Sequence, residues 1–127
     1  MKKILLAIIA MFTVESLAFT GSANEAIDAI RASAQLDSGG RPDDLVGIGI
    51  YRGKVMGAAA VYADAGFEDE ICVPEGVNGG QIATITTRYI LDNPDKWHES
   101  LSLLTWAAMY QTWGLASADD CQTRPTE

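Results

Sequence analysis

The stretch that decides the fold is ICVPEGVNGGQIATITTRYILDNP, residues 71–94. Its large apolar side chains recur at the spacing of one helix face: Ile82, Ile85, Tyr89 and Ile90. The opposite, solvent-facing side is expected to carry Thr84, Thr87 and Arg88. The pattern therefore predicts an amphipathic helix.

The Gly-rich turn before this helix is interpreted as its start. Asn78 and Gln81 have the spacing of a capping box, in which each side chain bonds the other residue's backbone N–H. A phosphate-binding loop would need a lysine and a Ser/Thr that GVNGGQ lacks. Asn93-Pro94 ends the helix, because a residue before proline avoids helical geometry.

The segment before it, LVGIGIYRGKVMGAAAVYADAG from residue 45 to 66, is predicted to be a second helix, because it is too long for a strand. Asp43 and Asp44 are candidate N-caps, and Gly66 is the expected stop. Gly49, Gly53 and Gly57 recur at every fourth position. Since each glycine costs a helix up to about 1 kcal/mol relative to alanine, we expect another backbone to pack closely against this row.

Two further helices are predicted, at residues 24–36 and at about 99–113. The last is apolar nearly all round, which indicates a central helix or part of a dimer interface, and Gly114 is its expected C-cap. The predicted fold is all-α: a single small domain of about four helices.

The first 18 residues, MKKILLAIIAMFTVESLA, have the order of a secretory signal peptide: lysines, an apolar run, then small residues. Ser16 and Ala18 predict a cut before Phe19, and Gly21 and Ala23 a second possible cut before Asn24. The apolar run of about 11 residues is too short to span about 30 Å of hydrocarbon. The helical domain would then occupy residues 19–127, with 115–127 a loose polar tail, and we expect a periplasmic protein.

The chain of 127 residues carries a net charge of −8, which becomes −9 when Lys2, Lys3 and Glu15 leave with the signal peptide. This balance argues against nucleic acid and anionic membrane surfaces as partners. It favours a basic protein partner, or solubility alone.

Cys72 and Cys121 are the two cysteines. In an oxidising compartment they predict one disulfide, either within a chain or between chains. A reactive thiol would need a basic neighbour, and nothing places His98, the one histidine, near Cys72.

No catalytic, cofactor or metal site is predicted. One histidine cannot supply a zinc ligand set. Three adjacent acids, Glu68, Asp69 and Glu70, lack the alternating spacing of a calcium loop and are expected to be solvated.

Residues 49–113 resemble the Tai-type immunity proteins, including the resistance-associated proteins, which guard bacteria against type VI secretion amidase effectors. The stretches that carry the resemblance are Gly49–Gly53 with Gly57, Ile71–Pro74, Gly76-Val77, Gln81, Arg88–Leu91, Asn93-Pro94 and the closing helix through Trp113. The family pattern has further cysteines, which are absent here.

The resemblance implies an all-α periplasmic domain, often dimeric, that blocks a cell-wall amidase by burying its catalytic cleft. The loop between Gly66 and Asn78 is the expected contact, through Glu68, Asp69, Glu70 and Glu75. A connecting loop without that role is the competing interpretation. The alternative function is that of a small acid-stress chaperone or a structural envelope protein, because low pH would discharge the many carboxylates.

Overall fold

A computed structural model describes residues 21–64 and 71–114 of the chain. Within these residues the elements are α2 (Ala23–Asp37), α3 (Leu45–Asp64), α4 (Gly79–Asp92), the short 3-10 helix η2 (Pro94–Lys96) and α5 (Leu101–Trp113). The described part holds two isolated β-bridges but no strand, so the all-α prediction is confirmed. None of its helices is both long and apolar enough to cross a membrane.

The helices begin and end where local chemistry dictates. The Asn78 side chain accepts from the Gln81 N–H at 3.0 Å, and the Gln81 side chain accepts from the Asn78 N–H at 2.8 Å. This confirms the predicted capping box of α4. Asp44 caps α3 by accepting from the Gly47 N–H at 2.8 Å, and Ser100 caps α5 in the same way. Gly114 is the C-cap of α5, as expected.

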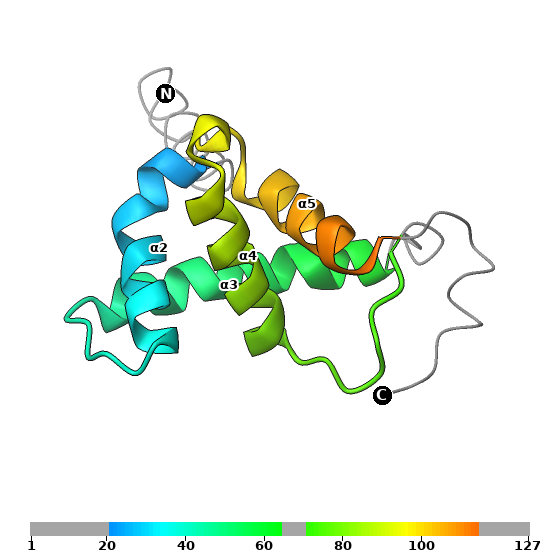
Figure 1. Cartoon of the computed structure of the whole chain (residues 1–127), viewed down its shortest axis with the longest axis horizontal. Helices are drawn as coiled ribbons and strands as arrows, with labels where there is room; N and C mark the ends of the chain where they lie inside the picture. The colour runs from blue at the N-terminus through cyan, green and yellow to red at the C-terminus, as the bar shows by residue number, and fades with distance from the viewer. Residues whose placement is uncertain (1–20, 65–70, 115–127) are drawn as a thin grey trace, which may run out of the picture.

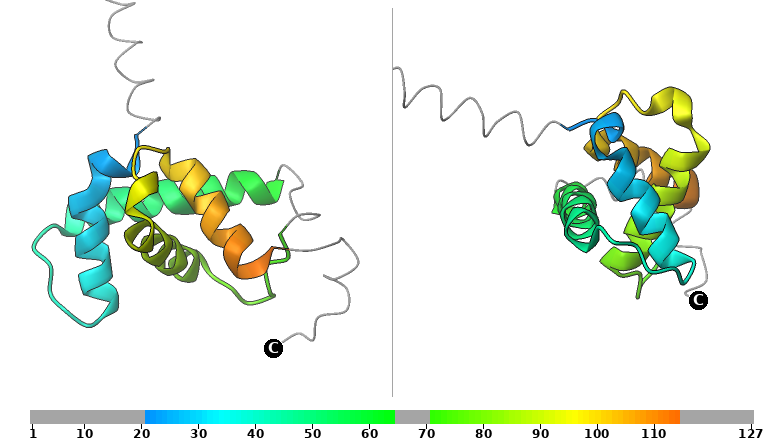
Figure 2. Two further views of the ribbon diagram at one scale, coloured as in Figure 1. Left: turned by 45° about the horizontal axis from the view of Figure 1, so that its top comes forward. Right: turned by 90° about the vertical axis from the view of Figure 1, so that its left-hand side faces the viewer.

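The longest helix, α3, forms one side of the bundle. In the right-hand view of Figure 2 α3 is seen end-on, and α2, α4 and α5 all lie on the same side of it. In Figure 1 α2 and α4 cross α3 steeply, and α5 crosses it nearer the C-terminal end of α3. One side of α3 therefore faces the bundle and the other does not.

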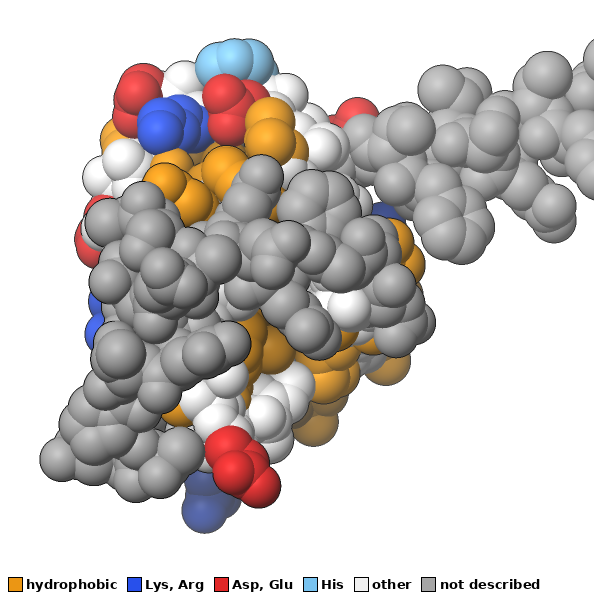
Figure 3. All heavy atoms as spheres, turned by 90° about the vertical axis from the view of Figure 1, so that its right-hand side faces the viewer, with side chains coloured by type: hydrophobic (Ala, Val, Ile, Leu, Met, Phe, Trp, Pro, Cys, Tyr) orange, Lys and Arg blue, Asp and Glu red, His pale blue; other side chains and the backbone are white. Residues whose placement is uncertain are grey.

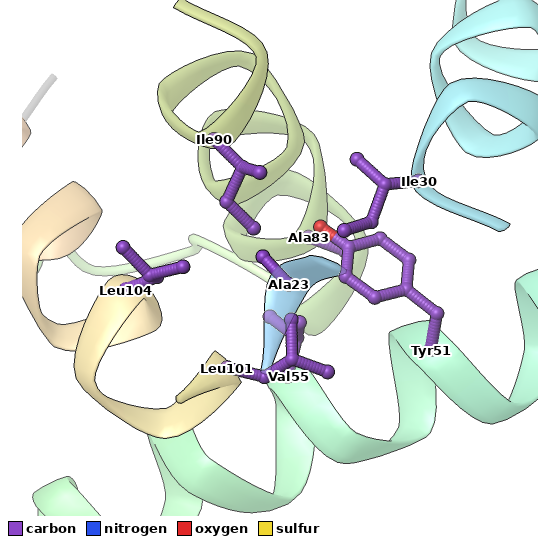
Figure 4. Packing of buried hydrophobic residues seen from close by; sticks show 8 residues of the cluster. All are labelled: Ala23, Ile30, Tyr51, Val55, Ala83, Ile90, Leu101 and Leu104. Carbon is purple, nitrogen blue, oxygen red and sulfur yellow. The ribbon is translucent and has the colours of Figure 1, made fainter. Parts of the chain in front are cut away.

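All four α-helices contribute to the main core. The buried cluster takes two residues from each of them: Ala23, Ile30, Tyr51, Val55, Ala83, Ile90, Leu101 and Leu104 (Figure 4). A second, smaller cluster of Ala59, Ile71 and Met109 lies beside it, with Trp106 and Trp113 packed against it. Ile71 thus anchors the segment that precedes α4.

The buried face of α4 is the predicted one only in part: Ile90 is buried and Arg88 is exposed, as predicted, but the face is rotated. It consists of Ala83, Thr86, Thr87 and Ile90, whereas Ile82, Ile85 and Tyr89 are half-buried. Thr87, expected on the solvent side, is only 2% exposed. The prediction was wrong for a physical reason: the Tyr51 hydroxyl reaches α4 and pairs with the Thr87 hydroxyl, so a polar residue can be buried there.

Candidate functional site

The segment Ile71–Asn78 (hereafter the 71–78 segment) is fixed at its start by the end of α5. Ile71 and Gly114 form an antiparallel bridge, and the Cys72 N–H donates to the Trp113 carbonyl at 3.1 Å. Ile71 itself is 5% exposed. Because backbone and side chain are both held, the segment leaves the bundle from a defined position.

Its other end is fixed as well. The Val77 N–H donates to the Pro74 carbonyl at 3.3 Å, which closes a turn around Glu75 and Gly76. Gly76 has φ +88°, a conformation that side-chain-bearing residues rarely adopt. The capping box then starts α4, and Gly79 lies so close to α3 that a Cβ there would sit 2.5 Å from the Met56 sulfur. Between these anchors Val73 and Glu75 face the solvent.

Of the four acidic residues predicted to bind a partner, the structure places one. Glu75 is exposed at the turn of the 71–78 segment. Glu68, Asp69 and Glu70 lie outside the described residues, as do Cys121, Gly66 and the tail. Cys72 is half-buried and is not a free cysteine.

A second surface was missed by sequence reasoning. The side of α3 that faces away from the bundle is apolar and exposed. Its apolar stripe is about 120° wide, which is the width that a helix usually buries against a neighbour. We refer to this stripe as the outward face of α3, and its residues are Val46, Gly49, Ile50, Gly53, Met56, Gly57 and Ala60. Met56 lies at its edge, where its side chain reaches Gly79 of α4. Val46 is 76% exposed and Ile50 58% exposed. Figure 3 shows hydrophobic side chains at the surface on the side where α3 lies.

The glycine row lies on this face, and no described segment of the same chain packs closely against it. A Cβ built at Gly49, Gly53 or Gly57 would meet nothing within 4 Å. Where α3 passes the start of α5, the row borders an apolar groove of about 810 Å³. The row makes this surface flat, and so able to accept another chain closely.

Beneath the surface, polar side chains join α3 to its neighbours. The Tyr51 and Thr87 hydroxyls pair at 3.0 Å, and Arg52 bonds Ser33 and forms an ion pair with Asp37. Burial raises the pKa of Tyr51 to about 12, so the phenol is neutral at physiological pH. These bonds fix α3 relative to α2 and α4, and thereby set which side of α3 is outward.

The one histidine of the chain lies at the surface. His98 is exposed in the turn after η2. Within residues 21–64 and 71–114, no three His, Cys, Asp or Glu side chains gather as a metal site would require.

A family model describing Rap1a immunity proteins matches residues 25–114. The chain belongs to the Rap1a immunity protein family. The match runs from the first turn of α2 to Gly114, and so includes all of α3, α4 and α5, the 71–78 segment and its anchor. No curated protein and no solved structure matches the chain.

Membership in the Rap1a family supports the predicted class of function, an immunity protein that counters a secreted toxin. It also implies that the partner is a protein, namely that toxin, and suggests an inhibitor that is not itself an enzyme.

Proposed function

We propose that this Rap1a-family protein acts in the periplasm and blocks a peptidoglycan amidase delivered by a type VI secretion system. Four considerations support this: family membership, the predicted signal peptide, the acidic charge and the 71–78 segment. The amidase would be bound through that segment and the acidic residues just before it.

The observation that carries the proposal is the two-ended anchoring of the 71–78 segment. A loop that is already ordered loses little conformational entropy on binding, which favours affinity. Val73 supplies an apolar contact and Glu75 a negative charge at its exposed turn. Negative charge on an inhibitor accelerates its encounter with a basic cleft.

The first experiment measures inhibition by the mature chain of an amidase encoded beside its gene, or delivered by a competing bacterium. We expect a tight complex and loss of peptidoglycan hydrolysis. If no such amidase is bound or inhibited, the proposed function is wrong.

The second experiment locates the contact with two variants of equal net charge. One neutralises the acids of the predicted contact: Glu68→Gln, Asp69→Asn, Glu70→Gln and Glu75→Gln. The control neutralises four exposed acids elsewhere: Glu25→Gln, Asp28→Asn, Asp92→Asn and Asp95→Asn. The first variant should lower the association rate constant roughly tenfold or more, and the control much less. Equal slowing would mean that only total charge matters.

We also propose a homodimer, formed through the outward face of α3. The outward face has a similar order of residues in both directions from Gly53. Gly49 and Gly57 are equally far from Gly53 along the helix, and so are Ile50 and Met56, and Val46 and Ala60. In an antiparallel pair of α3 helices with a two-fold axis beside Gly53, these residues lie at equal heights. The glycine rows then face each other between apolar side chains, in an isologous interface.

Sedimentation of Gly53→Arg tests the dimer. Nothing lies within 4 Å of a Cβ at Gly53, so the monomer should fold normally and the two chains should separate. The matched control, Gln111→Arg at an exposed position of α5, should leave the dimer intact. A monomeric wild-type chain would refute this part of the proposal.

A Cys72–Cys121 disulfide is part of the same proposal. The backbone of Cys72 is bonded to Trp113, which precedes Cys121 by only eight residues, so the chain can return to it. Closing this loop of 49 residues would stabilise the fold by roughly 4 kcal/mol. Mass measurement of the unreduced chain should show the loss of two hydrogens within a single chain, whereas a linked pair of chains would indicate an intermolecular bond.

A further inference from the structure

The residues just before α2 are joined to the start of α5. The Ala23 N–H donates to the Glu99 carbonyl at 3.1 Å, and the Leu101 N–H donates to the Gly21 carbonyl at 3.2 Å. Between these bonds, Ser22 and Ser100 form an antiparallel bridge. Gly21–Ala23 therefore pairs with a segment almost 80 residues later in the chain.

Ala23 is also part of the core. Its side chain is fully buried, and Figure 4 shows it among residues of the other three helices, close to Val55 and Leu101. Ser22 is the N-cap residue of α2, and its carbonyl accepts from the Glu25 N–H at 3.2 Å. Gly21–Ala23 thus belongs to the folded domain.

This arrangement distinguishes the two possible signal-cleavage sites. A cut before Asn24 would remove Gly21, Ser22 and Ala23. It would leave the Glu99 carbonyl and the Leu101 N–H without their partners and open the core where the Ala23 methyl group lies. It would also place a positively charged amino group at the N-terminus of α2, where the helix dipole disfavours it. A cut before Phe19 removes none of these contacts.

We infer that signal cleavage occurs before Phe19 and that the mature protein keeps Gly21–Ala23 as the residues that join α2 to α5. This inference rests on the proposed export. The reaction is hydrolysis of the Ala18–Phe19 peptide bond, with water giving the new carboxyl and amino termini.

The first test is the intact mass of the full chain after expression in a bacterium and recovery from its periplasm. The product should begin at Phe19. A product that begins at Asn24 overturns the inference and leaves export and immunity standing. An uncut chain retained in the cytosol overturns the inference together with the proposed export.

Two variants assign the site, because signal cleavage needs small residues one and three positions before the cut. Ala18→Phe should block processing and accumulate the precursor. Gly21→Phe alters only the second site, and its new Cβ would meet the ends of two flexible side chains, Glu25 and Lys54. It should be processed like the wild type. The opposite pattern would contradict the inference.

A stability measurement tests the structural reason separately. Chains made without the signal peptide and beginning at Phe19, Gly21 or Asn24 are compared by urea unfolding. The first two should be alike, whereas the chain beginning at Asn24 should have an unfolding equilibrium constant roughly 30-fold higher or more, from two lost hydrogen bonds and a core gap. Equal stability of all three would show that Gly21–Ala23 contributes nothing, and would overturn the inference.

Discussion

Helices α3 and α4 bury themselves in different ways. α4 has an apolar side and a polar side, and its buried residues are Ala83 and Ile90 together with Thr86 and Thr87. α3 is apolar over most of its surface, with Arg52 and Lys54 as the charged residues of its middle turns. Tyr51, Val55 and Ala59 are buried, whereas Val46, Ile50 and Val61 are exposed. The pattern of an amphipathic helix indicates roughly which side is buried. A mostly apolar helix is oriented by the helices that pack against it, and an apolar face can remain exposed.

The largest expected difference in unfolding free energy comes from replacing one isoleucine by alanine on each of the two helices. Ile90 of α4 is fully buried, so Ile90→Ala should lower the free energy of unfolding by about 2–5 kcal/mol. Ile50 on the outward face of α3 is the matched control. Ile50→Ala should change the free energy of unfolding by less than about 0.5 kcal/mol. Urea unfolding of dilute protein measures both. A large loss at Ile50 would mean that the outward face is covered.

The bond between the two helices gives the next effect. Thr87→Val leaves the buried Tyr51 hydroxyl without its partner and should lower the unfolding free energy by about 1–3 kcal/mol. Adding Tyr51→Phe removes both polar groups and should restore most of the loss. If the double variant is no more stable than Thr87→Val, the hydroxyl pair does not account for the loss.

Burial of the Tyr51 hydroxyl predicts a decline of stability in alkali, because burial disfavours the charged phenolate. Because the folded pKa of Tyr51 is raised to about 12 from an unfolded value of 10, the stabilisation is complete below pH 10. It is lost as pH rises from about 10 to about 12, at up to about 1.4 kcal/mol per pH unit. Comparing the wild type with Tyr51→Phe in urea at successive pH values isolates this contribution, and parallel curves would refute it.

A smaller effect is expected at the start of α4. Asn78→Ala removes one half of the capping box and should lower the unfolding free energy by about 1 kcal/mol, as measured by thermal unfolding. Asn93→Ala at the other end of α4 is a useful comparison, because it removes the side-chain bond of the C-cap residue to the Tyr89 carbonyl instead of the N-cap bond.

The smallest change should be a gain. Gly53→Ala adds a methyl group to open space on α3, so it should raise the unfolding free energy by at most about 1 kcal/mol, through helix propensity. The same measurement at concentrations that favour self-association sharpens the comparison. There the methyl group should destabilise the associated form, and a gain of equal size at both concentrations would argue against contact at Gly53.

The helices could be predicted because their signals are local. Asp44, the Asn78–Gln81 pair, Asn93-Pro94 and Gly114 each act on residues within four positions. Thr87 was misplaced because its partner, Tyr51, lies 36 residues earlier. The glycine row was noticed, but its exposure within the chain could not be predicted, because spacing shows that a face is smooth and not what lies against it.

The 71–78 segment was predicted only in part, because some of its contacts are local and others join residues far apart in the chain. The turn around Glu75 follows from proline and glycine, whereas the anchors of Ile71 and Cys72 lie about 40 residues later, at Trp113 and Gly114. The glycine row marked the outward face of α3 as smooth, but the sequence did not show that this face is exposed, because apolar residues lie on most sides of the helix.

The sequence by itself determined the helical class, the helix ends and the immunity-family character of this protein, because caps, breakers and motif residues act over short distances. Only the tertiary structure decided which side of α3 is buried, that Thr87 lies inside, and that Gly21–Ala23 belongs to the domain. Each of these depends on contacts between residues far apart in the chain. A helix that is apolar on most sides does not indicate which side will be buried until its neighbours pack against it.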